Sequence, residues 1–181
     1  MQKFQFLLLD AGVIIGAYEL GVWGQLVNQY TITITNTVKD QEVYYWYDEE
    51  QVGHEIDLNK YIQEGKLKCV DVPSSQLSGF LDKFDPTYLD RLDAGESDSL
   101  AFFLNQLDNG ENWYISSSDA IVYTVLGRLH LSERGISLEE ILYQIGRGRG
   151  LKKQYSKEFR IKATKKGEQD GIMDIGLQET D

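Results

Sequence analysis

Short apolar runs that end at an aspartate, with a helical pattern directly after, constrain this chain more than any other feature. The run FQFLLL at residues 4–9 precedes Asp10, and the run WYISSS at residues 113–118 precedes Asp119. Apolar runs of this length are typical of buried strands. Asp10 is expected to cap the turn after the first run, and the serine run at residues 116–118 is expected to cap the helix after the second. Strands that alternate with helices predict an α/β chain, with a mostly parallel central sheet between two helical layers.

A third acidic boundary lies in the stretch LDAGESDSLAFFL at residues 92–104. Gly95 suits a tight entry into a helix, and Glu96 and Asp98 fall in its first turn, where the helix macrodipole favours carboxylates. The macrodipole alone accounts for acids at one helix start. Acids recur at three boundaries, however, and parallel α/β sheets place their ligand sites at the carboxyl ends of strands. We therefore expect these acids to converge.

Converging carboxylates repel one another unless a cation joins them. Hard divalent ions such as Mg²⁺ and Mn²⁺ prefer oxygen ligands, and such ions can activate water and stabilise a phosphate leaving group. Acyl-transfer hydrolysis is disfavoured, because His130 comes after the expected helix and the GxSxG pattern is absent. Metal-dependent hydrolysis of a phosphodiester is the leading hypothesis.

Five segments, in this order and spacing, resemble the PIN-domain family of metal-dependent ribonucleases, which includes toxin–antitoxin nucleases. They are LLLDAGV, NTVKDQEVYYW, LDAGESDSLAFFL, YISSSDAIVYTVLGRL and GISLEEIL, and they span roughly residues 4–145. The resemblance implies a three-layer α/β/α PIN-like domain at residues 1–145, endoribonuclease activity, Mg²⁺ or Mn²⁺ as the cofactor and RNA as the substrate. It also allows a cognate antitoxin and a homodimer as partners.

The resemblance also implies roles for individual acids. Those implied in catalysis are Asp10, Glu42, Glu96 and Asp119. Those implied in metal binding are Asp10, Glu96, Asp119 and Asp98. Asp40 competes with Glu42 for the second position, because both lie within one turn. The alternative function on the same scaffold is a non-catalytic RNA- or protein-binding module, within a toxin–antitoxin system, whose carboxylates are surface groups or weak metal sites.

Composition sets outer bounds on the class of protein. The 181 residues suit one domain, and 41% hydrophobic residues are enough for a substantial core. The single cysteine, Cys69, excludes an internal disulfide framework, and no apolar stretch is long enough to span a membrane. We expect a cytoplasmic protein. The formal charge of −11 argues against indiscriminate coating of nucleic acid, because phosphate affinity comes from Lys and Arg.

Positive charge is nevertheless concentrated near the C-terminus. Residues 147–166 hold nine of the 18 Lys and Arg but only one of the 29 Asp and Glu. This segment is expected to bind RNA phosphates, and its Tyr155 and Phe159 could stack on bases. The expected substrate contacts are Arg147, Arg149, Lys152 and Lys153. The alternative is that this segment is a solvated terminal extension. Residues 146–181 together are expected to form a C-terminal extension, basic at first and then polar.

The remaining pattern predicts the order of the other elements. Further strands are expected at residues 31–35 and 66–72, and helices at residues 13–30, at residues 75–84 and after Ser137. Ser137 and Glu140 fit a capping box. The aromatic run at residues 44–47 is interpreted as core. The acidic segment after it, with His54, is interpreted as a surface loop and not as a zinc site.

Overall fold

A parallel sheet forms the centre of the computed structural model, which describes residues 6–147 and 151–178. Its four strands lie in the order β5-β2-β1-β6, and each neighbouring pair is parallel. The strands are β1 (Phe6–Leu9), β2 (Thr31–Thr35), β5 (Leu67–Val70) and β6 (Trp113–Ser116). The expected strands are confirmed, although residues 4 and 5 of the first lie outside the described residues. Because all four strands run the same way, their carboxyl ends meet at one edge of the sheet.

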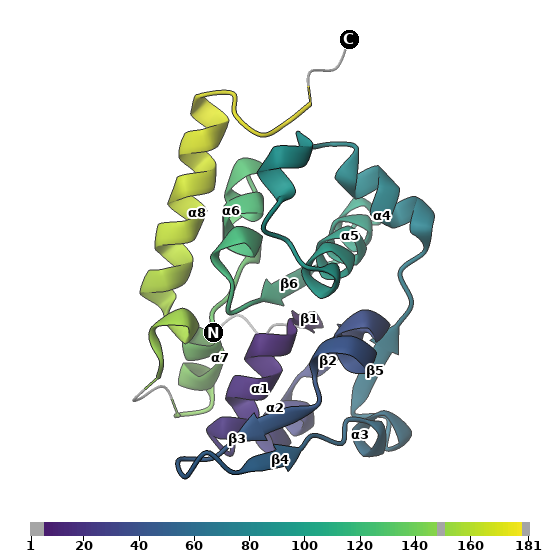
Figure 1. Cartoon of the computed structure of the whole chain (residues 1–181), viewed down its shortest axis with the longest axis vertical. Coiled ribbons are helices and arrows are strands. Elements are labelled where there is room, and N and C mark those ends of the chain that lie inside the picture. Colours follow the sequence, from purple (N-terminus) through teal and green to yellow (C-terminus); the bar gives the residue numbers. More distant parts are fainter. Residues whose placement is uncertain (1–5, 148–150, 179–181) are drawn as a thin grey trace.

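Helices cover both faces of this sheet, as Figure 1 shows. The described α-helices are α1 (Ala11–Glu19), α2 (Trp23–Gln29), α3 (Asn59–Gln63), α4 (Ser74–Leu81), α5 (Ala94–Asp108), α6 (Ala120–Arg128), α7 (Leu138–Gln144) and α8 (Lys157–Ile172). Leu7 and Leu9 of β1 pack into the core under α1, α2 and α7. Leu8, between them, packs into the second core with α5 and α6. This alternation places one core on each face, so the three-layer α/β/α fold is confirmed.

The helix expected at residues 13–30 is instead two helices, α1 and α2. Gly21 adopts a left-handed φ of 65° between them. Its N–H donates to the carbonyl of Tyr18, and the N–H of Val22 donates to the carbonyl of Ala17. This pair of hydrogen bonds is a Schellman motif, which ends a helix at a glycine. The apolar periodicity continues through the break because both helices bury the same side.

The aromatic run at residues 44–47 is not core, contrary to the sequence interpretation. It forms strand β3 (Tyr45–Tyr47), which pairs antiparallel with β4 (Gly53–Glu55) in a separate hairpin. Of its aromatic side chains, only Trp46 packs against the core, while Tyr44, Tyr45 and Tyr47 are each more than half exposed. The alternation of a strand buries every second ring, which a count of aromatics does not reveal.

The C-terminal segment packs onto the body of the protein. In Figure 1, α8 lies alongside α6, and two glycines permit this approach. A Cβ on Gly127 would lie 2.1 Å from the carbonyl oxygen of Thr164, and a Cβ on Gly167 would lie 1.9 Å from that of Thr124. The interpretation of this segment as a solvated extension is therefore wrong for α8.

The aromatic residues of the basic segment also point inward. Tyr155 is 4% exposed and lies against Gly16 of α1, and its hydroxyl donates to the carbonyl of Gly12 at 3.2 Å. Phe159 packs against the second core and meets Tyr123 edge-on, with ring centroids 6.5 Å apart. The idea that Tyr155 stacks on RNA bases is therefore wrong, and Phe159 uses part of its surface to pack against the core. Among the described helices, none has both the length and the apolar character needed to cross a membrane.

Candidate active site

Asp10 stands directly after β1 and caps α1. Its Oδ1 accepts a hydrogen bond from the N–H of Ala11 at 2.6 Å, and its Oδ2 accepts one from Ser117 Oγ at 2.7 Å. Burial raises the pKa of Asp10 to about 6, and the charges of Asp93 and Asp119 raise it further while the two hydrogen bonds oppose the shift. Asp10 is thus a buried carboxyl group whose charged form is disfavoured by the neighbouring acids.

Asp119 stands at the same edge, after β6, and caps α6. Its Oδ1 accepts from the N–H of Ile121 at 3.0 Å, and its own N–H donates to Ser117 Oγ at 2.9 Å. Ser117 therefore links the two aspartates, since its hydroxyl accepts from the backbone of Asp119 and donates to Asp10. The serine run was expected to cap α6, but Asp119 supplies the cap and Ser117 connects the acids.

Glu96 reaches this edge from the first turn of α5. It forms a capping box with Asp93: Asp93 Oδ1 accepts from the N–H of Glu96 at 2.8 Å, and Glu96 Oε2 accepts from the N–H of Asp93 at 3.1 Å. Glu96 is 4% exposed, and burial raises its pKa to about 8. The charges of Asp10, Asp93 and Asp119 add to the shift. Glu96 therefore lies within electrostatic reach of both aspartates.

Glu42, and not Asp40, points into the acid cluster. Glu42 ends the short π-helix at Val38–Glu42, and its Oε1 accepts from the N–H of Gly95 at 2.9 Å. A Cβ on Gly95 would lie 2.2 Å from Glu42 Oε2, so glycine is required for this approach. Asp40 is instead exposed and pairs with Lys39 at 2.8 Å.

The environment of Glu42 favours contact with a cation or with a hydrogen-bond donor. Burial raises its pKa to about 7, and the charges of Asp93, Asp10 and Asp98 contribute to the rise. Its Oε2 is buried and has no hydrogen-bond partner among the described residues. An unpartnered buried carboxylate oxygen is costly, so this atom fits a cation or a donor from a bound molecule.

Asp98 and Asp93 complete the cluster in different ways. Asp98 accepts a hydrogen bond from the hydroxyl of Thr37, which follows β2, and so ties α5 to that strand. Asp93 raises the pKa of three other acids, Asp10, Glu42 and Glu96. Sequence reasoning did not assign Asp93 to the site. The signal was its position three residues before Glu96, which is the spacing of a capping box.

The acids are close enough to interact, but their side chains do not form a complete metal-binding site. Within residues 6–147 and 151–178, no three Asp, Glu, His or Cys side chains are positioned to hold an ion together. Three of the carboxylates use oxygens in helix caps or in a capping box. Oxygen donors at this edge match the preference of Mg²⁺ and Mn²⁺, so the residues fit such an ion chemically.

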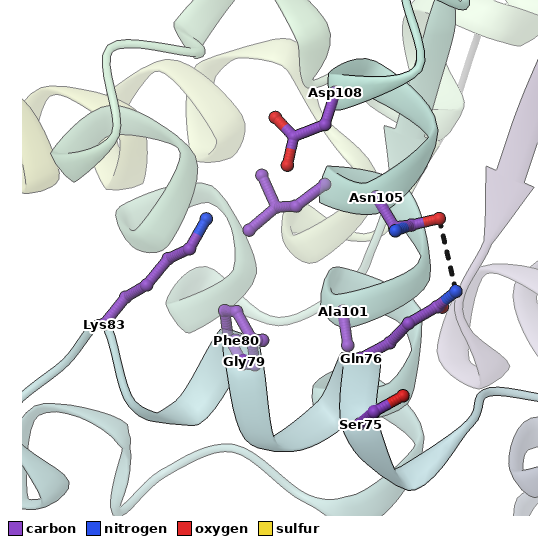
Figure 2. A pocket seen from close by; sticks show the side chains of 9 residues that line it. Ser75, Gln76, Gly79, Phe80, Lys83, Ala101, Asn105 and Asp108 are labelled. Atoms are coloured by element: carbon purple, nitrogen blue, oxygen red, sulfur yellow. Dashed lines mark hydrogen bonds between the residues drawn. The ribbon is translucent and has the colours of Figure 1, made fainter.

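The acid cluster is separate from the cleft between α4 and α5, which Figure 2 shows. That cleft has a volume of about 360 Å³. Gln76 of α4 reaches across it, and its Nε2 donates to Asn105 Oδ1 of α5 at 3.2 Å (Figure 2). Lys83 and Asp108 also line the cleft. None of the candidate acids lines it, so the cleft does not define the candidate active site.

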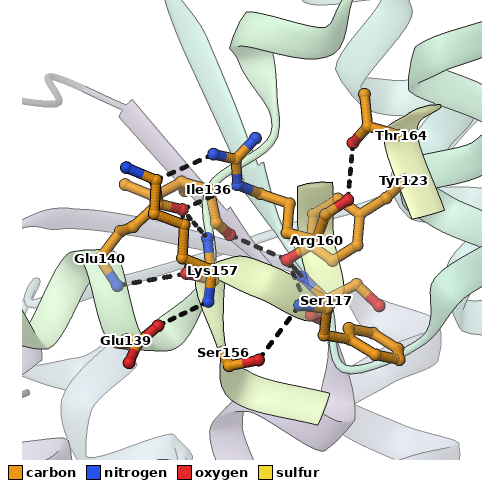
Figure 3. Close-up of polar contacts among 11 residues, drawn as sticks. Ser117, Tyr123, Ile136, Glu139, Glu140, Ser156, Lys157, Arg160 and Thr164 are labelled. Carbon is orange, nitrogen blue, oxygen red and sulfur yellow. Dashed lines mark hydrogen bonds and ion pairs between the residues drawn. The ribbon is translucent and has the colours of Figure 1, made fainter. Parts of the chain in front are cut away.

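The expected substrate contacts are only partly free for RNA. Arg147 and Lys153 are exposed, while Lys152 pairs with Glu19 of α1 at 2.7 Å. Arg149 lies outside the described residues. Farther along the basic segment, Arg160 donates two hydrogen bonds to the carboxylate of Glu140, from Nε at 2.7 Å and from Nη2 at 2.9 Å (Figure 3). The segment thus uses part of its charge to hold α8 on α7.

The hydroxyl group of Tyr123 holds the backbone next to the site in place. Its buried hydroxyl accepts from the N–H of Ser117 at 3.1 Å and lies within donor distance of two carbonyls, that of Ser117 at 2.8 Å and that of Ile136 at 2.9 Å. Figure 3 shows these three residues together. The serine that links Asp10 to Asp119 is therefore fixed by a side chain of α6.

Removing that hydroxyl gives a first prediction. Tyr123→Phe should lower the free energy of unfolding by about 1–3 kcal/mol, because the backbone groups of Ser117 lose a buried partner. Urea denaturation measures the change. Tyr143, which is 80% exposed on α7, provides the control, and Tyr143→Phe should leave stability unchanged. Equal stability of the two variants would contradict this role for Tyr123.

The raised pKa values predict how stability depends on pH without divalent ions. The pKa of Glu96 is about 8 in the folded protein against an ordinary value of 4.5, so between these values the folded protein holds a proton that the unfolded chain has released. The free energy of unfolding must then fall as pH rises through this window, by up to about 5 kcal/mol at about 1.4 kcal/mol per pKa unit. Thermal unfolding in a chelator at a series of pH values tests this, and Glu96→Gln should flatten the decline. A wild-type stability that rises over the window would contradict it.

Comparison of the chain with protein-family models, with curated proteins and with solved structures finds no match. The functional assignment therefore depends on the chain's own motifs and on the geometry of the acid cluster.

Proposed function

We propose that the protein is a metal-dependent endoribonuclease of the PIN-like type. The observation that carries the proposal is the meeting of carboxylates from four separate segments at the carboxyl edge of a parallel sheet. They are Asp10, Glu42, Glu96 and Asp119. Three of the four have pKa values raised by burial and by neighbouring acids. Carboxylates kept together against their mutual repulsion, at an edge where ligands bind, are typical of a site that takes a cation.

The proposed cofactor is Mg²⁺ or Mn²⁺. The residues that would hold it are Asp10, Glu96, Asp119 and Asp98. Glu42 would complete the site through its unpartnered Oε2. When bound, such an ion supplies positive charge and Lewis acidity for phosphodiester hydrolysis. The protein's own contribution is orientation: Ser117 positions the two aspartates, and the N–H of Gly95 positions Glu42.

RNA is the proposed substrate, with the exposed part of the basic segment as its phosphate contact. Changing Arg147, Arg149, Lys152 and Lys153 to glutamine should weaken RNA binding and reduce the slope of log affinity against log salt by up to about three. Fluorescence anisotropy with labelled single-stranded RNA in a chelator measures both quantities. The control neutralises three lysines outside this segment, Lys60, Lys66 and Lys68. A salt slope unchanged by the first set of substitutions would exclude this role.

One observation favours the second candidate, a non-catalytic binding module. Asp10 and Asp119 each cap a helix, and Glu96 belongs to a capping box. Caps of this kind stabilise helix starts without any ligand, so the acids have a structural use independent of catalysis. Both candidates are compatible with a cytoplasmic protein in a toxin–antitoxin system, with a cognate antitoxin or a homodimeric partner as further proposals.

Cleavage of a mixed RNA pool distinguishes the two candidates. The wild-type protein is incubated with the pool in Mn²⁺, in Mg²⁺ and in excess chelator. The nuclease proposal expects new RNA fragments with either ion and intact RNA with the chelator. RNA that stays intact under all three conditions, although the protein binds it, would favour the binding module.

A further inference from the structure

The β3–β4 hairpin is held rigidly on the body of the protein by its inner face. Trp46 packs against the core and stacks on His54, with ring centroids 4.5 Å apart. His54 Nε2 lies 2.8 Å from Asp48 Oδ2, and Asp48 Oδ1 accepts from the N–H groups of Glu50 and Val52 at 3.0 and 2.9 Å. The turn is therefore closed by side-chain hydrogen bonds, and the hairpin, at the lower end of Figure 1, is pre-formed.

The outer face of the hairpin exposes two tyrosines without a role in the core. Tyr45 is 54% exposed and lies opposite Glu55, and Tyr47 is 55% exposed and lies opposite Gly53. Directly opposed residues project from the same face of an antiparallel pair. The ring of Tyr47 extends over Gly53, since a Cβ there would lie 3.3 Å from it. Grouped, rigidly mounted aromatic side chains on a surface are typical of binding sites.

The charge around these rings selects the kind of partner. Residues 43–58 contain the five acids Asp48, Glu49, Glu50, Glu55 and Asp57, and no Lys or Arg. Phosphates of a nucleic acid would be repelled by this segment, although tyrosine rings can stack on bases. A guanidinium group fits better, because it stacks on an aromatic face and pairs with a carboxylate through the same planar group.

We propose that this hairpin face, formed by Tyr45, Tyr47 and Glu55, is a docking surface for an arginine-rich segment of a partner protein. Arginine side chains lie on the two tyrosine rings, Glu55 pairs with one of them, and the acids of the turn attract the segment over a longer range. The surface is distinct from the acid cluster, so binding here requires neither a divalent ion nor catalysis.

The test uses the full-length protein in chelator and four fluorescent probes. They are a nine-residue peptide that alternates Arg with Ser, its Lys counterpart, its Glu counterpart and a nine-nucleotide oligouridine. Anisotropy titrations should show binding of the Arg peptide, binding of the Lys peptide that is at least about threefold weaker, and no binding of the Glu peptide. Equal binding of the Arg and Lys peptides would contradict recognition by the aromatic rings.

Variants then locate the binding. The double variant Tyr45→Ser/Tyr47→Ser should weaken the Arg peptide about tenfold, and Glu55→Gln should weaken it about threefold. Tyr143→Ser, on a more exposed ring of α7, is the control and should not change binding. Thermal unfolding checks that the exposed substitutions preserve the fold.

Asp119→Asn separates the hairpin from the acid cluster, which could also attract arginine. We expect this variant to bind the Arg peptide as the wild type does. If Asp119→Asn abolishes peptide binding while the double tyrosine variant retains it, the docking surface is not the hairpin. The proposal is likewise overturned if oligouridine binds and the double tyrosine variant selectively loses it, because the rings would then serve RNA.

Discussion

Asp119→Asn should reduce Mn²⁺-dependent RNA cleavage at least about 100-fold and leave the fold intact. Asparagine removes the charge that a divalent ion requires, yet it can still accept the hydrogen bond that Asp119 Oδ1 receives from the N–H of Ile121. The substitution therefore separates the two roles of this residue, helix cap and proposed ion ligand. Initial rates of fragment release from the RNA pool measure the effect.

The control for this experiment is Asp90→Asn, which changes an exposed acid outside the cluster. It should cleave RNA at the wild-type rate. Asp10→Asn should behave as Asp119→Asn does, because Asp10 also combines a cap with a place in the cluster. Relief of repulsion should leave both cluster variants at least as stable as the wild type without ions, since the charge of Asp119 raises the pKa of Asp10. Full activity in Asp119→Asn would contradict the metal-nuclease mechanism.

Among the substitutions, Gly167→Ala should have the largest effect on stability. The added Cβ would lie 1.9 Å from the carbonyl oxygen of Thr124 and 2.8 Å from the backbone nitrogen of Arg128. Both are backbone atoms of α6 and cannot rotate away, so α8 must shift. Overpacking of this kind costs about 1–3 kcal/mol, and more when the contact holds a whole helix in place.

Gly171→Ala in the same helix is the matched control. Its Cβ would meet Arg128 Nη1 at 3.5 Å, which is an ordinary contact, and alanine favours a helix more than glycine by up to about 1 kcal/mol. We therefore expect the two substitutions to have opposite signs, with Gly167→Ala lowering and Gly171→Ala maintaining or raising the midpoint of urea unfolding. Loss of stability of the same size in both would contradict close packing of α8 on α6.

Local patterns predicted much of this fold. The strands at residues 31–35 and 113–116 are recognisable because β-branched or aromatic runs end at polar turns. The capping box of Ser137 and Glu140 is present, since it requires only a spacing of three residues. Asp10 and Asp119 lie at one edge because parallel strands place their ends together. These features depend on neighbours in sequence or on a single topological rule.

Features that depend on tertiary contacts were not predictable in the same way. Tyr155 belongs to a strongly basic segment, yet it is buried against Gly16, which is remote in sequence. Tyr45 and Tyr47 carry large aromatic rings of the kind that cores often contain, yet the pairing of their strand turns them outward. Glu42 lies in the cluster, and Asp40 outside it, because of the phase of a short π-helix and because Gly95 has no side chain to block Glu42. None of these can be read from local periodicity.

Calorimetric titration of Mn²⁺ into the chelator-free, full-length protein at pH 7 tests the central claim most directly, namely that the four segments build one divalent-ion site. The account predicts saturable binding with release of protons, because the pKa of Glu96 is about 8 and that of Glu42 about 7 before an ion binds. Repeating the titration in buffers of different ionisation enthalpy counts those protons, and Asp119→Asn should weaken binding at least about tenfold. Absence of Mn²⁺ binding, or binding that is identical in wild type and Asp119→Asn, would contradict the account.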